Sequence, residues 1–264
     1  KSTSIKILTG ILHPDEGRAD VLGLVPWKQR RQLALEIGTL FGQRSQLWFE
    51  LPARESLSLL GAIYRLDRGA VERRVDALGE LLDAAALFDV PVRHLSLGQR
   101  MRCELAASLL HEPQVLFLDE PTIGLDLVAK QRFRDLIVRL NEETGTTLFL
   151  TSHDVSDIEQ VARRVIVINH GRLIYDDKVS SMRRKLLRTK LLEVRFDHQV
   201  DGVEVEGAEV LKGSGTGYKL LVDTDRRAIR HVLDDLLDRY DVADISVLDP
   251  PLEDVITQIY EAKA

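Results

Sequence analysis

QVLFLDEP, at residues 114–121, is a compact apolar run that ends in two acids. An apolar run without alternation predicts a strand that is buried on both faces, as in a parallel sheet covered by helices. TTLFLTSHD at 146–154 has the same pattern, and EIGTLFG at 36–42 predicts a third, short strand. The segments around these strands have helical periodicity. The sequence therefore predicts an α/β fold with a mostly parallel sheet and helices on both faces.

Helical periodicity dominates from about residue 50 to residue 110, which predicts a helical subdomain there. Residues 1–12 predict another helix, and His13-Pro14 would end it. The apolar face of that helix would consist of Ile5, Leu8, Ile11 and Leu12. VIVINHGRLIYDD at 165–177 predicts two strands around an Asn-His-Gly turn. Two further helices are predicted at 130–145 and 155–164.

The composition changes near residue 182, where the basic run MRRKLLRTK begins. This run is either a solvated helix or a surface for anionic lipid or a partner. Beyond it, the pattern predicts a second, smaller α/β domain at 186–264, after a first domain at 1–181. The expected elements are strands at 191–198, 203–211, 218–223 and 243–249 and helices at 226–240 and 252–262.

The bulk composition limits the classes of function. The chain has 264 residues, 44% of them hydrophobic, and a formal net charge of −6, which argues weakly against a nucleic-acid-coating protein. It contains no apolar run of about 18 residues, the length that a membrane-spanning helix requires. One cysteine allows no intrachain disulfide, so a reducing cytoplasm is the simplest setting.

Three stretches carry residues suited to phosphate chemistry. Asp119-Glu120 ends a predicted strand at the carboxyl edge of a parallel sheet, where such sheets bind ligands. One acid could hold Mg²⁺ while its neighbour polarises a water. Two solvated acids without a catalytic role at a strand end would give the same sequence pattern. Lys1-Ser2-Thr3 opens a helix, and Ser96 precedes Gly98 at the start of another. Helix starts attract anions, but an ordinary N-capped helix explains the second as well.

The order and spacing of these stretches distinguish between the alternatives. Together they resemble the ATP-binding cassette (ABC) ATPases, the nucleotide-binding subunits of ABC transporters, from Lys1 to about Asp177. LSLGQ at 95–99 resembles the family's signature, VLFLDEP resembles the Walker B strand with its glutamate, and Lys1-Ser2-Thr3 resembles the end of the Walker A loop. Gln43, Asp126 and His153 match the family's Q-loop, D-loop and switch histidine.

The resemblance implies a role for each matched residue. ATP would be bound by one group of residues, Mg²⁺ by a second, and hydrolysis would depend on a third. The ATP-binding residues would be Lys1, Ser2, Thr3, Ser96, Gly98, Gln99 and Asp126, the Mg²⁺ ligands Ser2, Asp119 and Gln43, and the catalytic residues Glu120, His153 and Gln43. Two copies would pack head to tail around two ATP molecules, with Asp126 joining them.

FGQRSQLWFELP and the stretch from LSLGQ to GLD look most like export ATPases related to daunorubicin and sodium efflux systems. That group works with separate integral membrane permeases of the ABC-2 type. The resemblance implies a homodimer on the inner face of the cell membrane, in the cytoplasm, with no nucleic-acid partner. The alternatives are a soluble, non-transport ABC ATPase, which would carry a coiled coil, a zinc module or a second cassette, and a fragment inactive as given.

QLWFELP at 46–52 directly follows the predicted Q-loop glutamine. Its large apolar residues could form core of the helical subdomain. They could equally form a groove for a short cytoplasmic helix of the membrane partner, because the family makes that contact beside the Q-loop. These residues are Leu47, Trp48, Phe49 and Leu51.

Two departures from the family pattern carry expectations. Leu97 replaces the first signature glycine, so its side chain should point away from the nucleotide. The family's P-loop glycines would precede Lys1, so we expect residues 1–264 to be an N-terminally truncated and inactive fragment. A helix N-terminus contributes about 0.3–1 kcal/mol toward an anion, and a 1 mM complex needs about 4 kcal/mol. Calorimetric titration of 1–264 should therefore give a dissociation constant for Mg-ATP weaker than about 1 mM.

Overall fold

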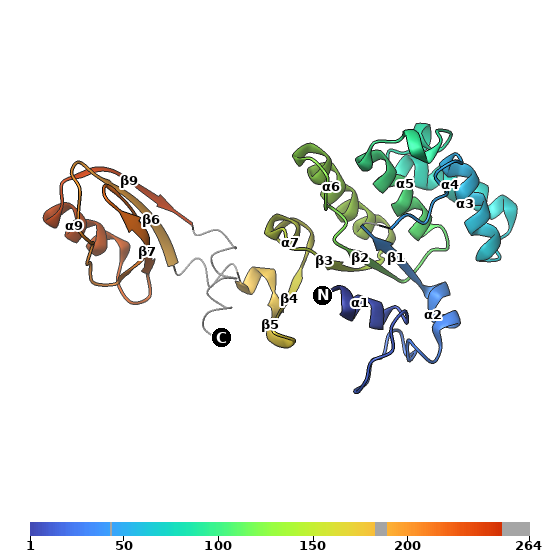
Figure 1. Cartoon of the computed structure of the whole chain (residues 1–264), viewed down its shortest axis with the longest axis horizontal. Coiled ribbons are helices and arrows are strands. Elements are labelled where there is room, and N and C mark those ends of the chain that lie inside the picture. Colours follow the sequence, from blue (N-terminus) through green and yellow to red (C-terminus); the bar gives the residue numbers. More distant parts are fainter. Residues whose placement is uncertain (43, 183–188, 250–264) are drawn as a thin grey trace. The chain divides into compact units, whose positions relative to one another are not determined.

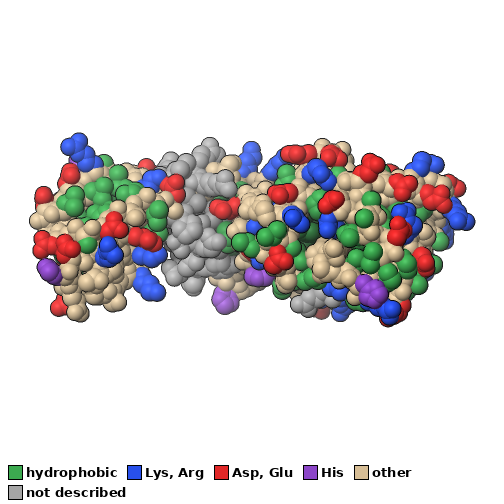
Figure 2. Space-filling model, turned by 90° about the horizontal axis from the view of Figure 1, so that it is seen from above, with side chains coloured by type: hydrophobic (Ala, Val, Ile, Leu, Met, Phe, Trp, Pro, Cys, Tyr) green, Lys and Arg blue, Asp and Glu red, His purple; other side chains and the backbone are tan. Residues whose placement is uncertain are grey.

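The computed structural model describes residues 1–42, 44–182 and 189–249. Two compact units make up the chain, Lys1–Val161 and Ala162–Ala264. The boundary between an ATPase domain at 1–181 and an accessory domain at 186–264 stays a prediction. On the face that Figure 2 shows, acidic and basic side chains are interspersed over both units. No helix among the described residues combines the length and apolarity needed to cross a membrane.

A three-stranded parallel sheet of order β1-β2-β3 forms the centre of the first unit, as the sequence predicts (Figure 1). Its strands are β1 (Ile37–Phe41), β2 (Val115–Asp119) and β3 (Thr147–Thr151). The register pairs Leu118 with Leu40 on one side and with Leu150 on the other. Because the strands are parallel and in register, their carboxyl ends lie together at one edge of the sheet.

Helices cover both faces of this sheet (Figure 1). Side chains alternate along β2, so Leu116 and Leu118 join the large core with α5 and α6, whereas Phe117 packs with α1 and α2 on the other face. The helical subdomain adds α3 and α4 to the large core. The helices are α1 (Ser2–Leu8), α2 (Arg30–Glu36), α3 (Ala53–Ile63), α4 (Arg68–Leu81), α5 (Leu97–Leu109), α6 (Leu127–Thr144) and α7 (Val155–Val161). Two short 3-10 turns, Ala85–Leu87 and Val92–His94, lead into α5.

The second unit begins with the predicted hairpin, in which β4 (Arg164–Asn169) pairs antiparallel with β5 (Arg172–Lys178). His170 and Gly171 form its turn with φ of 45° and 74°, the left-handed conformation that an Asn-His-Gly turn supplies. An antiparallel sheet of order β7-β8-β6-β9 follows and packs one face on α9. Its elements are β6 (Thr189–Phe196), β7 (Ala208–Ser214), β8 (Gly217–Asp223), α9 (Ile229–Arg239) and β9 (Val242–Leu248).

Three sequence predictions were wrong in detail. The first helix ends at Leu8, not at His13-Pro14, because Gly10 turns the chain with φ of 73°. An added Cβ at Gly10 would lie 2.6 Å from the Pro26 carbonyl oxygen, so the turn requires glycine. Ile11 and Leu12 therefore leave the predicted apolar face and are exposed.

The strand predicted at 146–154 is only partly buried, because β3 is an edge strand of the described sheet. The strand predicted at 203–211 begins only at Ala208, after a turn at Gly207 with φ of 82°. Two predictions fall outside the described residues. These are the helix at 252–262 and most of the basic run, residues 183–188.

Candidate active site

The carboxyl edge of the parallel sheet brings two of the predicted cation ligands together. Asp119 is the last residue of β2, and its Oδ1 accepts a hydrogen bond of 2.6 Å from the hydroxyl of Thr151, its register partner on β3. The same Oδ1 accepts a bond of 3.1 Å from the Ser2 hydroxyl, at the first residue of α1. A carboxylate and a hydroxyl thus meet at one point. Mg²⁺ prefers oxygen ligands and is held by one or two carboxylates together with substrate phosphates, so this donor set fits the ion.

Lys1 lies at the same edge. Its Nζ donates a hydrogen bond of 2.7 Å to the carbonyl oxygen of Ser152, the residue after β3. Lys1 is also the N-cap residue of α1, so the ammonium group and the free amides of the helix start lie on neighbouring residues. Thr3, in the first turn of α1, is exposed. Two sources of positive charge therefore adjoin the Ser2–Asp119 contact.

Glu120 and His153 are 33 residues apart in the sequence but form a direct contact. The distance from His153 Nδ1 to Glu120 Oε2 is 2.7 Å, and the His153 amide lies 3.3 Å from the same oxygen. Glu120 has φ of 52°, a strained conformation for a residue with a side chain, and its amide donates to the Thr151 carbonyl. The His153 side chain is 64% exposed and that of Glu120 is 23% exposed. The pair thus combines a fixed carboxylate with a histidine open to solvent.

The signature segment forms the start of α5. Ser96 is the N-cap, and its hydroxyl accepts a hydrogen bond of 3.3 Å from the Gln99 amide, while Gln99 Oε1 accepts one of 2.9 Å from the Ser96 amide. These reciprocal bonds form a capping box. Gly98 packs against α6, because an added Cβ would lie 3.3 Å from the Ala129 Cβ. Leu97 Cδ2 lies 3.2 Å from the position of a Cβ on Gly124, so this side chain packs onto the segment after β2.

Asp126 caps α6 in the same way, since its Oδ1 accepts a hydrogen bond of 2.8 Å from the Ala129 amide. The side chains of Ser96, Gln99 and Asp126 thus bond to their own helices and not to the Asp119–Glu120 edge. Leu127 and Val128, directly after Asp126, are large hydrophobic residues with 78% and 60% exposure. Gln43, assigned to catalysis and to Mg²⁺, lies outside the described residues.

A buried network behind the site was missed by the sequence reasoning. Asp157, on α7, is 1% exposed, and its Oδ2 accepts hydrogen bonds of 2.6 Å from the hydroxyls of both Thr122 and Ser152. Thr122 follows Glu120 by two residues, and Ser152 directly precedes His153. Oδ1 accepts a bond of 2.6 Å from Arg134 Nε on α6. Asp157 therefore joins the two loops that carry the Glu120–His153 pair.

The neighbouring Asp154 extends this network toward solvent. Its Oδ2 accepts hydrogen bonds of 2.8 Å from Lys130 Nζ and 3.2 Å from Arg134, both on α6. The bond from Lys130, followed by the positive charge of both residues, lowers the pKa of Asp154. A lowered pKa means that the ion pair stabilises the fold at neutral pH and loses this contribution in acid.

A second buried acid, Glu104 on α5, was also missed. Its side chain carboxylate bonds to the Ser45 hydroxyl and accepts a hydrogen bond of 2.9 Å from the Gln46 amide. Burial raises the pKa of Glu104, against the opposing effect of these two bonds. The signal available in the sequence was an acid between Cys103 and Leu105, both fully buried, on a helix otherwise rich in small apolar residues.

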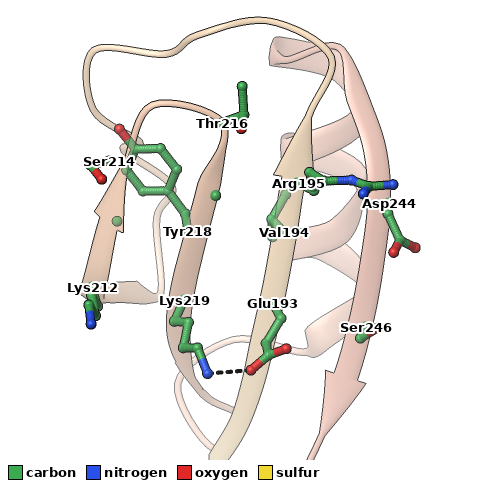
Figure 3. Close-up of a pocket in the computed structure, with 12 residues that line it drawn as sticks. Glu193, Val194, Arg195, Lys212, Ser214, Thr216, Tyr218, Lys219, Asp244 and Ser246 are labelled. Atoms are coloured by element: carbon green, nitrogen blue, oxygen red, sulfur yellow. Dashed lines mark ion pairs between the residues drawn. The ribbon is translucent and has the colours of Figure 1, made fainter.

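The second unit carries a hollow of about 540 Å³ on its four-stranded sheet (Figure 3). Val194 points into the core with α9, so its neighbours Glu193 and Arg195 point to the opposite face. Glu193 is paired at 2.5 Å with Lys219 on the adjacent strand β8. The remaining charged residues of the hollow are Lys212 and Asp244. Its mixed charges are typical of a solvated sheet face.

The parallel sheet, the lysine and hydroxyl at a helix start, and the acid pair at the strand end define a nucleotide-binding α/β ATPase. The family model described as "ABC transporter" matches residues 1–123. Daunorubicin resistance ATP-binding protein DrrA3 of Streptomyces coeruleorubidus is 36% identical over 229 residues, covering 87% of this chain and 70% of that protein. The chain belongs to the ABC transporter ATP-binding family, in the group that includes these daunorubicin resistance proteins. It is an ATP-binding ATPase.

Two further comparisons agree with this assignment. Nod factor export ATP-binding protein I of Neorhizobium galegae is 35% identical over 199 residues, covering 74% of this chain and 55% of that protein. Among solved structures, CbiO1 of Clostridium perfringens, part of the ABC transporter complex CbiONQ, superimposes with a TM-score of 0.62 at 28% identity. The superposition covers 71% of this chain and 78% of the CbiO1 chain. The expected family and fold class are thus confirmed.

Proposed function

We propose that this chain is the ATP-hydrolysing subunit of an exporter and works with a separate integral membrane permease of the ABC-2 type. The names of the daunorubicin resistance and Nod factor export relatives support the direction of transport. The observation that carries the proposal is the convergence of Ser2, Asp119, Glu120 and His153 at one sheet edge. We place the protein in the cytoplasm, peripheral on the inner face of the membrane.

Within this proposal the residues divide the work as follows. Asp119 and Ser2, with Gln43, hold Mg²⁺, which neutralises the phosphate charge when bound. The Lys1 ammonium and the amides at the start of α1 bind phosphate oxygens, with Thr3 beside them. Glu120 takes the proton of the attacking water, and His153, held at 2.7 Å from it, contacts the terminal phosphate.

The exposed start of α6 supports a homodimer. Leu127 and Val128 are strongly exposed beside Asp126, although large apolar side chains are costly to leave in water. A second copy packed head to tail would cover them and would bring its own Ser96, Gly98 and Gln99 to the nucleotide. The capping box of Ser96 is compatible with this role, since a capped helix start still presents free amides.

The segment after the Q-loop supports the contact with the permease. The sequence allowed two interpretations of this segment, a buried core and a contact surface, and each applies to different residues. Leu47 is 4% exposed, whereas Trp48 and Phe49 are 43% and 45% exposed. Leu47 therefore packs in the core of the helical subdomain. Trp48 and Phe49 present two aromatic rings at the surface, the residue type that commonly dominates binding energy at interfaces.

We expect Trp48→Ala and Phe49→Ala to weaken binding to the permease by more than 2 kcal/mol, a loss of about thirtyfold in affinity. The melting temperature should change little, because both side chains are half exposed. Co-purification with the permease, measured beside thermal melting, checks this result. Leu47→Ala is the matched control. It truncates a core side chain, which should cost about 2–5 kcal/mol in the free energy of unfolding and lower the melting temperature.

The same preparation tests the proposed function as a whole. In protein that carries the P-loop glycines that the family resemblance implies, the permease should bind and should alter the rate of ATP hydrolysis. Hydrolysis that proceeds without any response to the permease would favour a non-transport ABC ATPase. A large melting drop in the Trp48 variant, with an unchanged ratio of bound permease to folded protein, would refute the role of the aromatic pair.

A further inference from the structure

Glu104 makes contacts that connect the signature helix to the surface that we assign to the permease. It lies on α5, five residues after the signature segment, and is 3% exposed. Its Oε1 bonds to the Ser45 hydroxyl and its Oε2 accepts the Gln46 amide at 2.9 Å. Both oxygens of a buried carboxylate are thus used by two consecutive residues of one surface segment.

A second residue of the same helix face contacts the same segment. Arg100 precedes Glu104 by four residues, so the two side chains lie on one face of α5. The Arg100 guanidinium carbon lies 5.3 Å from the centre of the Phe49 ring, within the range of a cation–π contact. Arg100 and Glu104 therefore hold residues 45–49 at both ends, with Trp48 between the two contacts.

The segment is also tied to the rest of the fold. Gln46 Nε2 donates a hydrogen bond of 2.7 Å to the Thr39 carbonyl on β1, and the Trp48 amide donates one of 3.1 Å to the buried Ser56 hydroxyl on α3. Its position therefore depends on the sheet, on α3 and on α5 together. Among these attachments, the one made by Glu104 joins the segment directly to the helix that begins at Ser96.

We propose that Glu104 is a positioning residue that, with Arg100, fixes residues 45–49 on the signature helix and so sets the orientation of Trp48 and Phe49 for the permease. The proposal rests on the proposed function of these two aromatic residues. Movement of α5 when a second copy engages Ser96 would then reach the permease surface through Glu104. Because both oxygens bond to this one segment, loss of the carboxylate would release Ser45 and Gln46 together.

The chain allows this proposal to be tested without nucleotide. Trp27 and Trp48 are its two tryptophans, so Trp27→Phe leaves Trp48 as the fluorescent reporter. In that background, Glu104→Leu should increase acrylamide quenching of Trp48 and weaken permease binding by about tenfold or more, the scale of one hydrogen bond to a charged group. Glu104→Gln should restore both. Its amide oxygen can accept the Gln46 amide, and the Ser45 hydroxyl can donate to the Leu47 carbonyl, 3.1 Å away.

Glu143→Leu is the matched control, because Glu143 is exposed on α6 and should change neither measurement. Ser45→Ala would remove the hydroxyl's contact with Glu104 together with its bonds to the amide and carbonyl of Leu47. The deciding variant, if Glu104→Leu does not fold, is therefore Arg100→Leu, which removes the contact with Phe49 and leaves the Ser45 bonds in place. An increase in Trp48 quenching in Arg100→Leu supports the proposal, and no increase overturns it. A folded Glu104→Leu protein with unchanged quenching and permease binding also overturns it. Altered quenching in a protein whose wild type binds no permease supports the positioning role while refuting the proposed function.

Discussion

Replacing Glu120 with glutamine is expected to lower the rate of ATP hydrolysis by about 10²–10⁴-fold, the contribution of a general base. Affinity for ATP should change little, because the amide keeps the shape of the side chain and can still contact His153. An amide cannot take the proton of the attacking water, however, so the chemical step loses its base. Phosphate release and ATP binding check this result, measured in protein that carries the P-loop glycines that the family resemblance implies ahead of Lys1.

The companion variants separate the base from its neighbour. His153→Ala should also reduce hydrolysis, whereas Glu112→Gln, in an exposed ion pair with Arg74, should leave it unchanged. Gel filtration of the Glu120→Gln protein should reveal a dimer that persists in ATP, because bound nucleotide is no longer consumed. Hydrolysis by Glu120→Gln at close to the wild-type rate would assign the base elsewhere, with His153 the next candidate.

Local pattern was sufficient to predict the elements that build the site. An apolar run ending in Asp119-Glu120 predicts a buried parallel strand, and the carboxyl ends of parallel strands share an edge. Local pattern left two solvated acids as an alternative, and the family resemblance then assigned Asp119, Glu120 and His153 to one site before any contact was known. The hairpin at Asn-His-Gly was equally predictable, because left-handed turn residues are recognisable in sequence.

The end of the first helix was not predictable in the same way. Leu8, Ile11 and Leu12 continue a helical apolar pattern, yet the chain turns at Gly10, where the backbone of Pro26 comes too close for any side chain. That approach depends on residues 16 positions away and leaves no trace in local periodicity. The division between buried Leu47 and exposed Trp48 has a similar cause, since it is set by packing against the helical subdomain.

Polar contacts over long distances in the sequence were the other omission. Glu104 bonds to Ser45 and Gln46, and Asp157 bonds to Thr122 and Arg134. Composition predicts that such acids are solvated, because charged residues are mostly exposed unless they are paired. The pairs form only when three or more elements pack together. The motifs therefore predicted the site residues themselves but not the buried acids that support them.

The largest effect on stability is expected from Asp157→Ala. Arg134 is 5% exposed in its side chain, and Asp157 Oδ1 accepts its Nε at 2.6 Å. Removing the buried carboxylate leaves Arg134 with only its 3.2 Å contact to Asp154 and removes the shared acceptor of the Thr122 and Ser152 hydroxyls. Breaking such a buried pair costs about 3–5 kcal/mol in the free energy of unfolding. Urea denaturation followed by circular dichroism measures this loss. Glu143→Ala removes a carboxylate that pairs with Arg139 at the exposed surface of α6, and it should cost less than about 1 kcal/mol.

Milder variants test whether Asp157 also positions the catalytic pair. Thr122→Val and Ser152→Ala each remove one hydroxyl and leave the Asp157–Arg134 ion pair intact, so each should cost only about 0.5–1.5 kcal/mol of stability. Both hydroxyls are adjacent to the loops of Glu120 and His153, so both variants should lower kcat with little change in KM for ATP. A loss of stability without any change in kcat would restrict the network to folding. A fall in kcat in a protein of nearly wild-type stability would mean that the buried Asp157 keeps Glu120 and His153 in the relative position that hydrolysis requires.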